Sequence, residues 1–320
     1  MNRRTFLQTS LSTAAAFTAA GCGGNRKRQI AVIPKGSAHL FWQSVHAGAV
    51  KCARERNSEI IWNGPATEVD YTAQLQIIDA MINRRVDAIA LAPIDKKAMV
   101  TAVERAAKEK IPVVIFDSGI DTEQFVAQVA TDNFRGGELG ADRIAKLLNG
   151  EGKVAMVKVQ PGSASTMERE DGFEQRIAKV YPGIKIVDAR YGMADFAKSL
   201  AVTENMLTAH PDLGALFASN ESSTVGAVRA LKQRKSEVKL VGFDSSAALV
   251  DDLKAGAIDS LVIQDPFRIG YDSVKSALDH LDGKPVAKMQ PLPPRLVDLA
   301  NVNEPEVQAQ LNPDLKTYLD

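Results

Sequence analysis

The chain has 320 residues, 45% of them hydrophobic and 24% charged, which is typical of a globular protein and long enough for two domains. Lys plus Arg and Asp plus Glu number 39 each, so the formal net charge is zero. Without a basic excess the chain offers no surface for phosphates, which argues against nucleic acid as a partner. Aromatic residues make up only 6%, so one beside a candidate site is informative.

The first residues are typical of an export signal rather than of a fold. Residues 2–8, Asn-Arg-Arg-Thr-Phe-Leu-Gln, resemble the twin-arginine export motif, and the uncharged stretch 9–20 is too short for a permanent membrane helix. Residues 19–22, Ala-Ala-Gly-Cys, resemble a bacterial lipobox, in which the cysteine is lipidated and begins the mature protein. We therefore expect residues 1–22 to be removed or processed, a lipid on Cys22 that attaches the protein to the membrane, and a periplasmic or cell-envelope location. The alternative is a plain cleaved secretory signal with a chance cysteine.

From Arg28 onward, apolar runs of strand length alternate with segments of helical periodicity. The first half predicts strands 30–34, 60–62, 88–92 and 112–116 and helices 40–56, 71–84 and 98–110. After a switch near 126–132, the second half predicts strands 154–159, 184–189, 215–218, 239–243 and 261–263 and helices 136–148, 170–180, 196–209, 223–231, 249–253 and 269–281. The Pro-rich tail around residues 291–294 fits an extended segment. This alternation predicts an α/β fold with two parallel sheets, each covered by helices on both faces.

Cysteine and histidine give no sign of a disulfide, a metal site or another cofactor. Cys52 lies in a helical pattern with Val45 and Ala49 and is expected to pack as a small hydrophobe. With Cys22 assigned to lipidation, no second cysteine remains for Cys52 to pair with. The four histidines are too far apart in sequence to form a spaced metal motif.

Polar side chains follow the predicted strands, where open parallel sheets bind their ligands. The tripeptide Phe-Asp-Ser occurs twice in such a place, at 116–118 and at 243–245. The other strand-end segments are 35–42, 92–95, 162–169, Asp195-Phe196, Asn220-Glu221 and Gln264-Asp265. Carboxylates accept from neighbouring hydroxyls, amides both donate and accept, arginine donates in a fork, and aromatic rings cover the C–H faces of a sugar. The set indicates a neutral, polyhydroxylated ligand.

Each of these residues also has a purely structural interpretation. An Asp or Ser after a strand is often the N-cap of the next helix, and Asn220 has the right position for such a cap. Arg169 is a candidate for a surface ion pair with Glu170 or Asp171. Phe41 and Trp42 open an amphipathic helix and have the character of core residues, whereas a lone His39 is typical of a solvated loop. These interpretations leave the shared placement at strand ends in both halves unexplained.

Several motifs carry a family resemblance in their order, spacing and chemistry. They are Ile-Pro-Val-Val-Ile-Phe-Asp at 111–117, Ala-Thr-Asp-Asn at 130–133 with Gly-Gly at 136–137, Glu-Arg-x-Asp-Gly-Phe at 168–173, the segment 208–221, and Val-Gly-Phe-Asp at 241–244 with Gln264 about twenty residues on. From about residue 30 to residue 285, the chain resembles the periplasmic sugar-binding proteins of the ribose-binding type, relatives of the lac-repressor core.

The resemblance implies a type I periplasmic binding fold: two doubly wound parallel-sheet lobes joined by three crossovers near residues 131, 264 and 290. Lobe one is expected at 28–131 plus 265–289, and lobe two at 132–264 plus 290–320. It also implies a non-enzymatic, monomeric substrate-binding protein of a sugar ABC importer. Its partners would be a monosaccharide or polyol clasped between the lobes and a transmembrane permease.

The ligand-binding residues that the resemblance implies come from both lobes. They are Lys35, His39, Phe41, Trp42, Asp117, Ser118, Arg169, Phe196, Asn220, Asp244 and Gln264. Phe41 or Trp42 would stack on one face of the sugar ring and Phe196 on the other. Ribose binders have Asn in place of His39 and Arg in place of Ser118. The small Ser118 opens space for a sugar larger than ribose or differently substituted, and His39 both donates and accepts and titrates near neutral pH.

Other functions remain as alternatives. A lipid-anchored sensor that presents its bound sugar to a chemoreceptor or kinase would have the same ligand site. A glycoside-active enzyme would use Asp117 and Asp244 as its pair of carboxylates. A small furanone-like signal is an alternative ligand. A transcription regulator is disfavoured, because an export signal stands where a DNA-binding headpiece would be.

Overall fold

The structure is a computed structural model that describes residues 26–37 and 39–319. The expected export signal and the expected lipidation at Cys22 lie outside the described residues. Among the helices of the described ranges, none has both the length and the apolar character that crossing a membrane requires.

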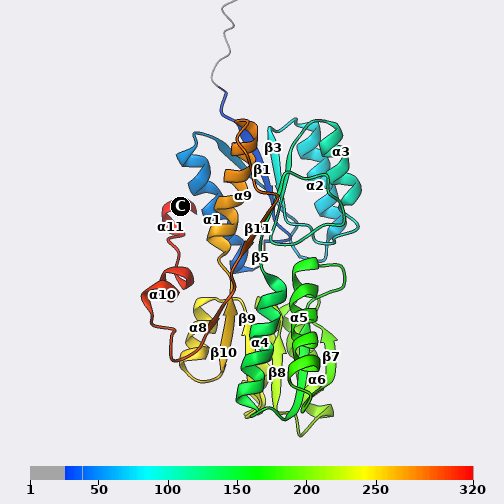
Figure 1. Cartoon of the computed structure of the whole chain (residues 1–320), viewed down its shortest axis with the longest axis vertical. Helices are drawn as coiled ribbons and strands as arrows, with labels where there is room; N and C mark the ends of the chain where they lie inside the picture. Colours follow the sequence, from blue (N-terminus) through cyan, green and yellow to red (C-terminus); the bar gives the residue numbers. More distant parts are fainter. Residues whose placement is uncertain (1–25, 38, 320) are drawn as a thin grey trace, which may run out of the picture.

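Two six-stranded sheets form the frames of two lobes, which lie one above the other in Figure 1. The first sheet contains β1 (Gln29–Ile33), β2 (Glu59–Trp62), β3 (Ala88–Leu91), β4 (Val113–Phe116), β5 (Ala127–Thr131) and β11 (Met289–Leu292). Its order is β11-β5-β4-β3-β1-β2, and all its strands are parallel. The second sheet contains β6 (Gly152–Lys158), β7 (Ile184–Tyr191), β8 (Ala215–Ala218), β9 (Lys239–Phe243), β10 (Ser260–Ile263) and β12 (Arg295–Val297). Its order is β12-β10-β9-β8-β6-β7, parallel except for the edge strand β12.

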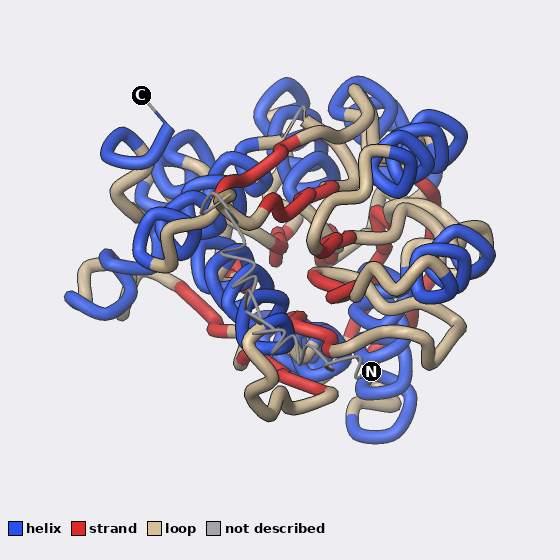
Figure 2. The backbone as a smooth tube through the Cα atoms, turned by 90° about the horizontal axis from the view of Figure 1, so that it is seen from above, coloured by secondary structure: helices blue, strands red, loops and turns tan. Residues whose placement is uncertain are grey.

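Helices surround the strands of both sheets (Figure 2). The helices of the first lobe are α1 (Leu40–Glu55), α2 (Tyr71–Asn83), α3 (Val100–Lys108) and α9 (Pro266–Leu281). The second lobe has α4 (Asn133–Leu147), α5 (Ala164–Val180), α6 (Phe196–Ala209), α7 (Glu221–Arg234), α8 (Ala247–Lys254) and α10 (Pro305–Leu311).

Alternation along the strands explains why helices cover both faces of each sheet. In β1, Ile30 and Val32 belong to one hydrophobic cluster with residues of α1 and α9, while Ala31 and Ile33 belong to another with residues of α2 and α3. Strand β8 divides its side chains between two clusters in the same way. Because both faces are apolar, the ends of the strands are the part of each sheet left for polar chemistry.

The chain passes between the sheets after β5, after β10 and between β11 and β12. The predicted architecture of two doubly wound parallel-sheet lobes with three crossovers is therefore confirmed. Cys52 is fully buried in a hydrophobic cluster, as expected of a small hydrophobe.

Local elements differ from the sequence prediction in three places. Helix α5 begins at Ala164 rather than at residue 170, with Ser163 as its N-cap. The predicted switch region contains strand β5, and helices α10 and α11 (Lys316–Leu319) near the end of the chain were not predicted. Polar or small residues dominate these segments, so their apolar periodicity is too weak to reveal them. The Pro-rich stretch around residues 291–294 is extended, as predicted, and forms β11 and β12.

The exact lobe boundaries given above remain a prediction. Two C-terminal elements, β11 and α11, make contacts with the first lobe. Strand β11 pairs with β5 at the edge of the first sheet. Beyond it, α11 packs on α1 of the first lobe, where Arg54 donates to the carbonyl oxygens of Thr317 at 2.6 Å and Tyr318 at 3.2 Å. Helix α11 therefore lies beside the first lobe (Figure 1).

Candidate ligand-binding site

The aspartates of the two Phe-Asp-Ser segments line one cavity from opposite lobes. Asp117 follows β4 with φ of 60°, and Asp244 follows β9 with φ of 69°. A left-handed backbone is unfavourable for a residue with a side chain and is concentrated at functional sites. Neither aspartate is the N-cap of the helix that follows it in sequence, since Ser246 caps α8 and β4 leads to β5. The capping interpretation of these two residues is therefore wrong.

Asp117 forms a buried ion pair that reaches the second lobe. Its Oδ2 lies 2.8 Å from Nζ of Lys35, which also donates to Oγ of Ser165 at 2.9 Å and of Ser163 at 3.2 Å. Oδ2 accepts no hydrogen bond of regular geometry from a described residue. The Ser118 hydroxyl accepts from the backbone N–H of Ser165 at 3.0 Å. Lys35 and Ser118 thus connect the strand ends of the first lobe to the N-terminus of α5.

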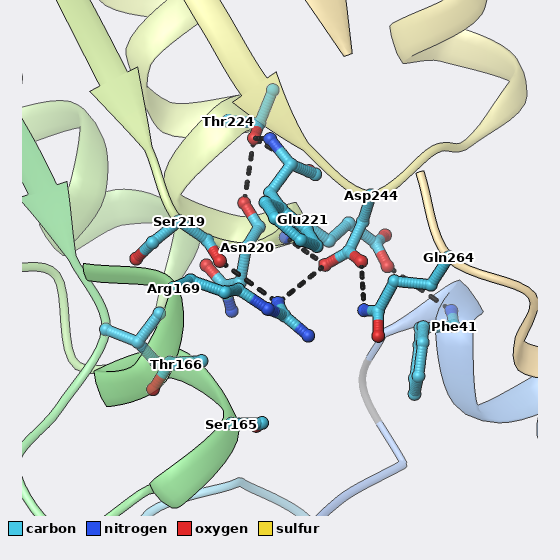
Figure 3. A network of polar contacts seen from close by, with 12 residues as sticks. Phe41, Ser165, Thr166, Arg169, Ser219, Asn220, Glu221, Thr224, Asp244 and Gln264 are labelled. Carbon is cyan, nitrogen blue, oxygen red and sulfur yellow. Dashed lines mark hydrogen bonds and ion pairs between the residues drawn. The ribbon is translucent and has the colours of Figure 1, made fainter. Parts of the chain in front are cut away.

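Asp244 accepts hydrogen bonds on both oxygens (Figure 3). The backbone N–H of Glu221 donates to Oδ2 at 2.8 Å, and Nε2 of Gln264 donates to Oδ1 at 2.6 Å. Oε1 of Gln264 accepts from the Thr131 hydroxyl at 2.6 Å, which joins two of the crossovers. Burial raises the pKa of Asp244, although the guanidinium of Arg169, 3.9 Å from Oδ2, acts in the opposite direction.

Arg169 is buried in the first turns of α5 and is not a surface residue. Its Nε donates to Oδ1 of Asn133 at 2.8 Å and its Nη1 to the carbonyl of Ser219 at 3.0 Å. Its guanidinium lies 4.0 Å from the ring centroid of Phe243. The expected alternative of an ion pair with Glu170 or Asp171 is wrong, and the guanidinium is held rigidly beside the cavity instead.

Asn220 is both a helix cap and a cavity residue. Its Oδ1 accepts from the backbone N–H of Ser223 at 2.9 Å, so the prediction that it caps α7 is confirmed. Its side chain also lines the cavity. Because the cap uses the amide oxygen, the amide NH2 is the group left for a ligand.

Aromatic side chains of the first lobe line the cavity, and one from the second lobe packs behind His39. Phe41 and Trp42, at the start of α1, lie perpendicular with ring centroids 4.9 Å apart, and they also belong to the hydrophobic core of the first lobe. Phe196, at the start of α6, makes an edge contact of 5.2 Å with the ring of His39. The interpretation of Phe41 and Trp42 as core residues is correct but incomplete, since both line the cavity as well.

His39 is buried rather than solvated, and it pairs with Glu68. Its Nδ1 lies 2.6 Å from Oε1 of Glu68, the oxygen that also accepts from Nε1 of Trp42 at 2.7 Å. Burial lowers the pKa of His39, but the Glu68 carboxylate, together with Glu221 and Asp244, outweighs the effect of burial and raises the pKa to about 9. Burial raises the pKa of Glu68, but the charges of His39 and Lys35 and the hydrogen bonds from His39 and Trp42 outweigh burial and lower the pKa to about 2.

Comparison with known proteins finds a match to a family model described as a periplasmic binding protein domain, over residues 30–285. The chain belongs to the periplasmic binding protein family. The ribose import binding protein RbsB of Bacillus subtilis is 32% identical over 256 residues, which cover 80% of this chain and 82% of that protein. A D-ribose/D-allose-binding protein of Pseudomonas aeruginosa is 32% identical over 268 residues, 81% of this chain and 83% of its own.

Solved structures agree with this assignment. A carbohydrate transporter solute-binding protein from Agrobacterium radiobacter, in complex with D-arabinose, superposes with a TM-score of 0.87 at 33% identity, covering 89% of this chain and 99% of that one. An ABC transporter solute-binding protein from Agrobacterium vitis with bound D-fucose gives a TM-score of 0.86 at 33% identity, over 89% and 100% of the two chains.

Most of the residues predicted from the sequence line the cavity of this periplasmic binding protein: Lys35, His39, Phe41, Trp42, Asp117, Arg169, Asn220, Asp244 and Gln264. Ser118 and Phe196 lie one contact away, Ser118 against Ser165 and Phe196 against His39. Their roles as ligand contacts remain predictions.

Four lining residues were not predicted as site residues: Glu68, Ser165, Thr166 and Glu221. Glu68 follows β2, and the strand-end rule applied to that strand would have pointed to it. Glu221 directly follows the predicted Asn220. Burial and the nearby Asp244 raise the pKa of Glu221 to about 7, although His39 acts in the opposite direction. Ser165 and Thr166 lie in the strand-end segment 162–169, but the sequence predicts the helix only from residue 170 and does not single out these two residues as ligand contacts.

The charges of the cavity are matched. Lys35 pairs with Asp117, His39 with Glu68, and Arg169 lies beside Asp244. Glu221, whose pKa is raised to about 7, is only partly ionised near neutral pH. A cavity of this kind favours an uncharged ligand that donates and accepts many hydrogen bonds.

Proposed function

We propose that this protein is the extracytoplasmic substrate-binding component of a sugar ABC importer and that it clasps a monosaccharide or related polyol between its lobes. Relatives named for ribose import, and solved structures with bound D-arabinose and D-fucose, support a sugar as the ligand. The chemistry of the cavity supports it independently, because carboxylates, an amide, a guanidinium and aromatic rings surround one space.

The observation that carries the proposal is the placement of Asp117 and Asp244, one from each sheet, around the same cavity. A sugar bound there would accept and donate hydrogen bonds on both walls at once. The sugar can form hydrogen bonds with both lobes only when the lobes are closed, so ligand binding favours closure.

Two residues favour a sugar other than ribose. His39 and Ser118 replace the asparagine and arginine of ribose binders, and Ser118 contributes a hydroxyl that is already bonded to Ser165. The smaller side chain leaves room for an additional substituent on the sugar.

The protein acts by binding rather than by catalysis. Asp117 is held in an ion pair with Lys35, and Asp244 accepts hydrogen bonds from Glu221 and Gln264. These contacts favour the carboxylates as fixed acceptors rather than as an acid and base pair. The twin-arginine-like and lipobox-like segments support export and a lipid on Cys22, and the importer role supports a monomer that delivers its sugar to a permease.

A thermal-shift screen of the chain from Gly23 onward tests the proposal against pentoses, hexoses, deoxysugars, polyols and cyclitols. A ligand at a hundred times its Kd stabilises the folded protein by about 2.7 kcal/mol, which raises Tm clearly. A shift with one group of sugars would identify the substrate class. If well-folded protein, free of co-purified ligand, responded to none of them, the sugar assignment would be wrong.

A further inference from the structure

Glu68 holds two cavity side chains with a single oxygen. Its Oε1 lies 2.6 Å from Nδ1 of His39 and 2.7 Å from Nε1 of Trp42. All three residues belong to the first lobe, so the arrangement does not depend on closure. The backbone carbonyl of Glu68 accepts from Nε2 of Gln160 at 2.7 Å, which adds a contact with the second lobe.

The pairing determines which atom of His39 is left for a ligand. Nδ1 is committed to Glu68, and no hydrogen bond joins Nε2 to any residue in the described ranges. His39 lines the cavity, so Nε2 is the ring nitrogen available there. An imidazole protonated on both nitrogens donates from Nε2, whereas a neutral ring protonated on Nδ1 can only accept there.

We propose that Glu68 is a positioning residue that keeps His39 doubly protonated, so that Nε2 is a fixed hydrogen-bond donor to a sugar hydroxyl, while the same carboxylate orients the indole of Trp42. The proposal rests on the proposed function for the ligand, but the state of the imidazole can be measured without one.

The charges that face His39 support this arrangement. Besides Glu68 from the loop after β2, Glu221 at the start of α7 and Asp244 at the end of β9 both raise the pKa of His39, against the effect of burial. The cation Lys35 lies near Glu68, and the uncharged ring of Phe196 packs on His39 from α6. Glu68 is the acidic partner in direct contact, so it is the one to alter.

Glu68→Gln is the decisive variant, because the amide oxygen can still accept from both Nδ1 of His39 and Nε1 of Trp42, and only the charge is lost. In ligand-free protein, NMR titration of the imidazole should show a His39 pKa above its ordinary value in the wild type, because Glu68 lies in the same lobe, and a clearly lower value in Glu68→Gln. His39→Asn identifies the His39 signal by its loss. Glu123→Gln makes the same chemical change at an exposed glutamate of the first lobe and should leave the titration unchanged.

Calorimetric titration with the sugar found by screening tests the role in binding. Raising the pH from 6 to 8 should weaken sugar binding in both proteins. The fold-loss of affinity should be about tenfold larger in Glu68→Gln than in the wild type, which corresponds to a difference of one pKa unit. The double variant His39→Asn/Glu68→Gln should lose this excess, which assigns the proton to His39.

The outcomes separate the parts of the proposal. An unchanged His39 titration in Glu68→Gln would overturn the role of Glu68. A lowered pKa without any added pH dependence of sugar affinity would overturn the role of His39 as a donor to the ligand. If the wild type bound no sugar, the proposed function would fail and the donor role with it, while the NMR titration would still decide whether Glu68 holds the proton.

Discussion

Lys35 and Asp117 are both almost fully buried, so each depends on the other to compensate its charge. Asp117→Ala leaves the ammonium of Lys35 without its carboxylate and removes an acceptor from the cavity. We expect sugar affinity to fall by about 2–4 kcal/mol, because buried partner groups are left unpaired. Isothermal titration calorimetry measures the change, with Asp212→Ala at an exposed site as the control. Unchanged affinity in Asp117→Ala would contradict the assignment of this residue to the site.

Asn220 combines two roles that substitution can separate. Asn220→Ser keeps a side-chain oxygen for the cap of α7 but lacks the amide NH2, so it should retain Tm and lose sugar affinity. Asn220→Ala should lose both, with about 1 kcal/mol of stability lost through the cap. Thermal unfolding and calorimetry on the two variants measure the two effects. If Asn220→Ser bound sugar as the wild type does, Asn220 would be a cap only.

The residues of the site were predictable where they stand at strand ends within recognisable motifs. Asp117, Asn220 and Asp244 satisfy both conditions. Glu68 follows a strand but lies outside any motif, and its role depends on contacts with His39 and Trp42 that only the fold creates. The left-handed backbone at both aspartates was likewise not visible in the sequence.

At the scale of elements, α7 of the second lobe supplies a capping group to α1 of the first. The N-cap of α1, His39, makes no side-chain cap, and Oε2 of Glu221 accepts from the backbone N–H of Phe41 at 3.3 Å instead (Figure 3). A carboxylate at a helix N-terminus is favourable, and here it is present only when the lobes meet. Because the two residues belong to different lobes, we expect this contact only in the closed form.

This contact predicts a pH dependence of closure. Burial raises the pKa of Glu221 to about 7, although His39 acts in the opposite direction and Asp244 in the same one. An acid whose pKa rises on closure takes up a proton, so closure is favoured at low pH, and that advantage is lost as pH rises through 7. Sugar affinity of the wild type should therefore be higher at pH 5.5 than at pH 7.5. In Glu221→Gln this difference should shrink, and an equal difference in both proteins would show that another group carries the proton.

The elements themselves were predictable to the extent that their apolar pattern is strong. Helix α6 and strands β8 and β9 have the predicted bounds, and in both strands the buried run is continuous or nearly so. The first turns of α5 are polar since they face the cavity, so the apolar pattern predicts the helix only from residue 170 and does not single out Ser165 and Thr166. The polar residues that α5 contributes to the site thus weaken the apolar pattern that would otherwise reveal the start of this helix.

At the scale of the whole molecule, the C-terminal segment spans both lobes. Val307 of α10 is buried in a hydrophobic cluster of the second lobe, Nε2 of Gln310 donates to the carbonyl of Gln264 at 2.8 Å, and α11 then packs on α1. The segment lies beyond residue 285, where the match to the family model ends. We therefore expect its contacts with Arg54 and α1 to resist separation of the lobes.

Removal of residues 313–320 should therefore speed sugar release. We expect a higher dissociation rate constant with little change in the association rate constant, because the closed form loses contacts that the open form lacks. Stopped-flow fluorescence, which Trp42 in the cavity makes practicable, measures both. Arg54→Ala should reproduce the effect in part, and an unchanged dissociation rate in both variants would show that the segment does not restrain opening.

The central claim is that one sugar is held by both lobes, and the distance between the lobes during a sugar titration tests it most directly. Spin labels on Ala66→Cys and Ala197→Cys report from exposed sites of the first and second lobes, while the fully buried Cys52 thiol, whose pKa burial raises to about 12, stays unlabelled. The account predicts that sugar converts a broad, longer set of distances into one short distance, with a midpoint equal to the calorimetric Kd. A distance that does not change while sugar binds with full affinity would contradict it.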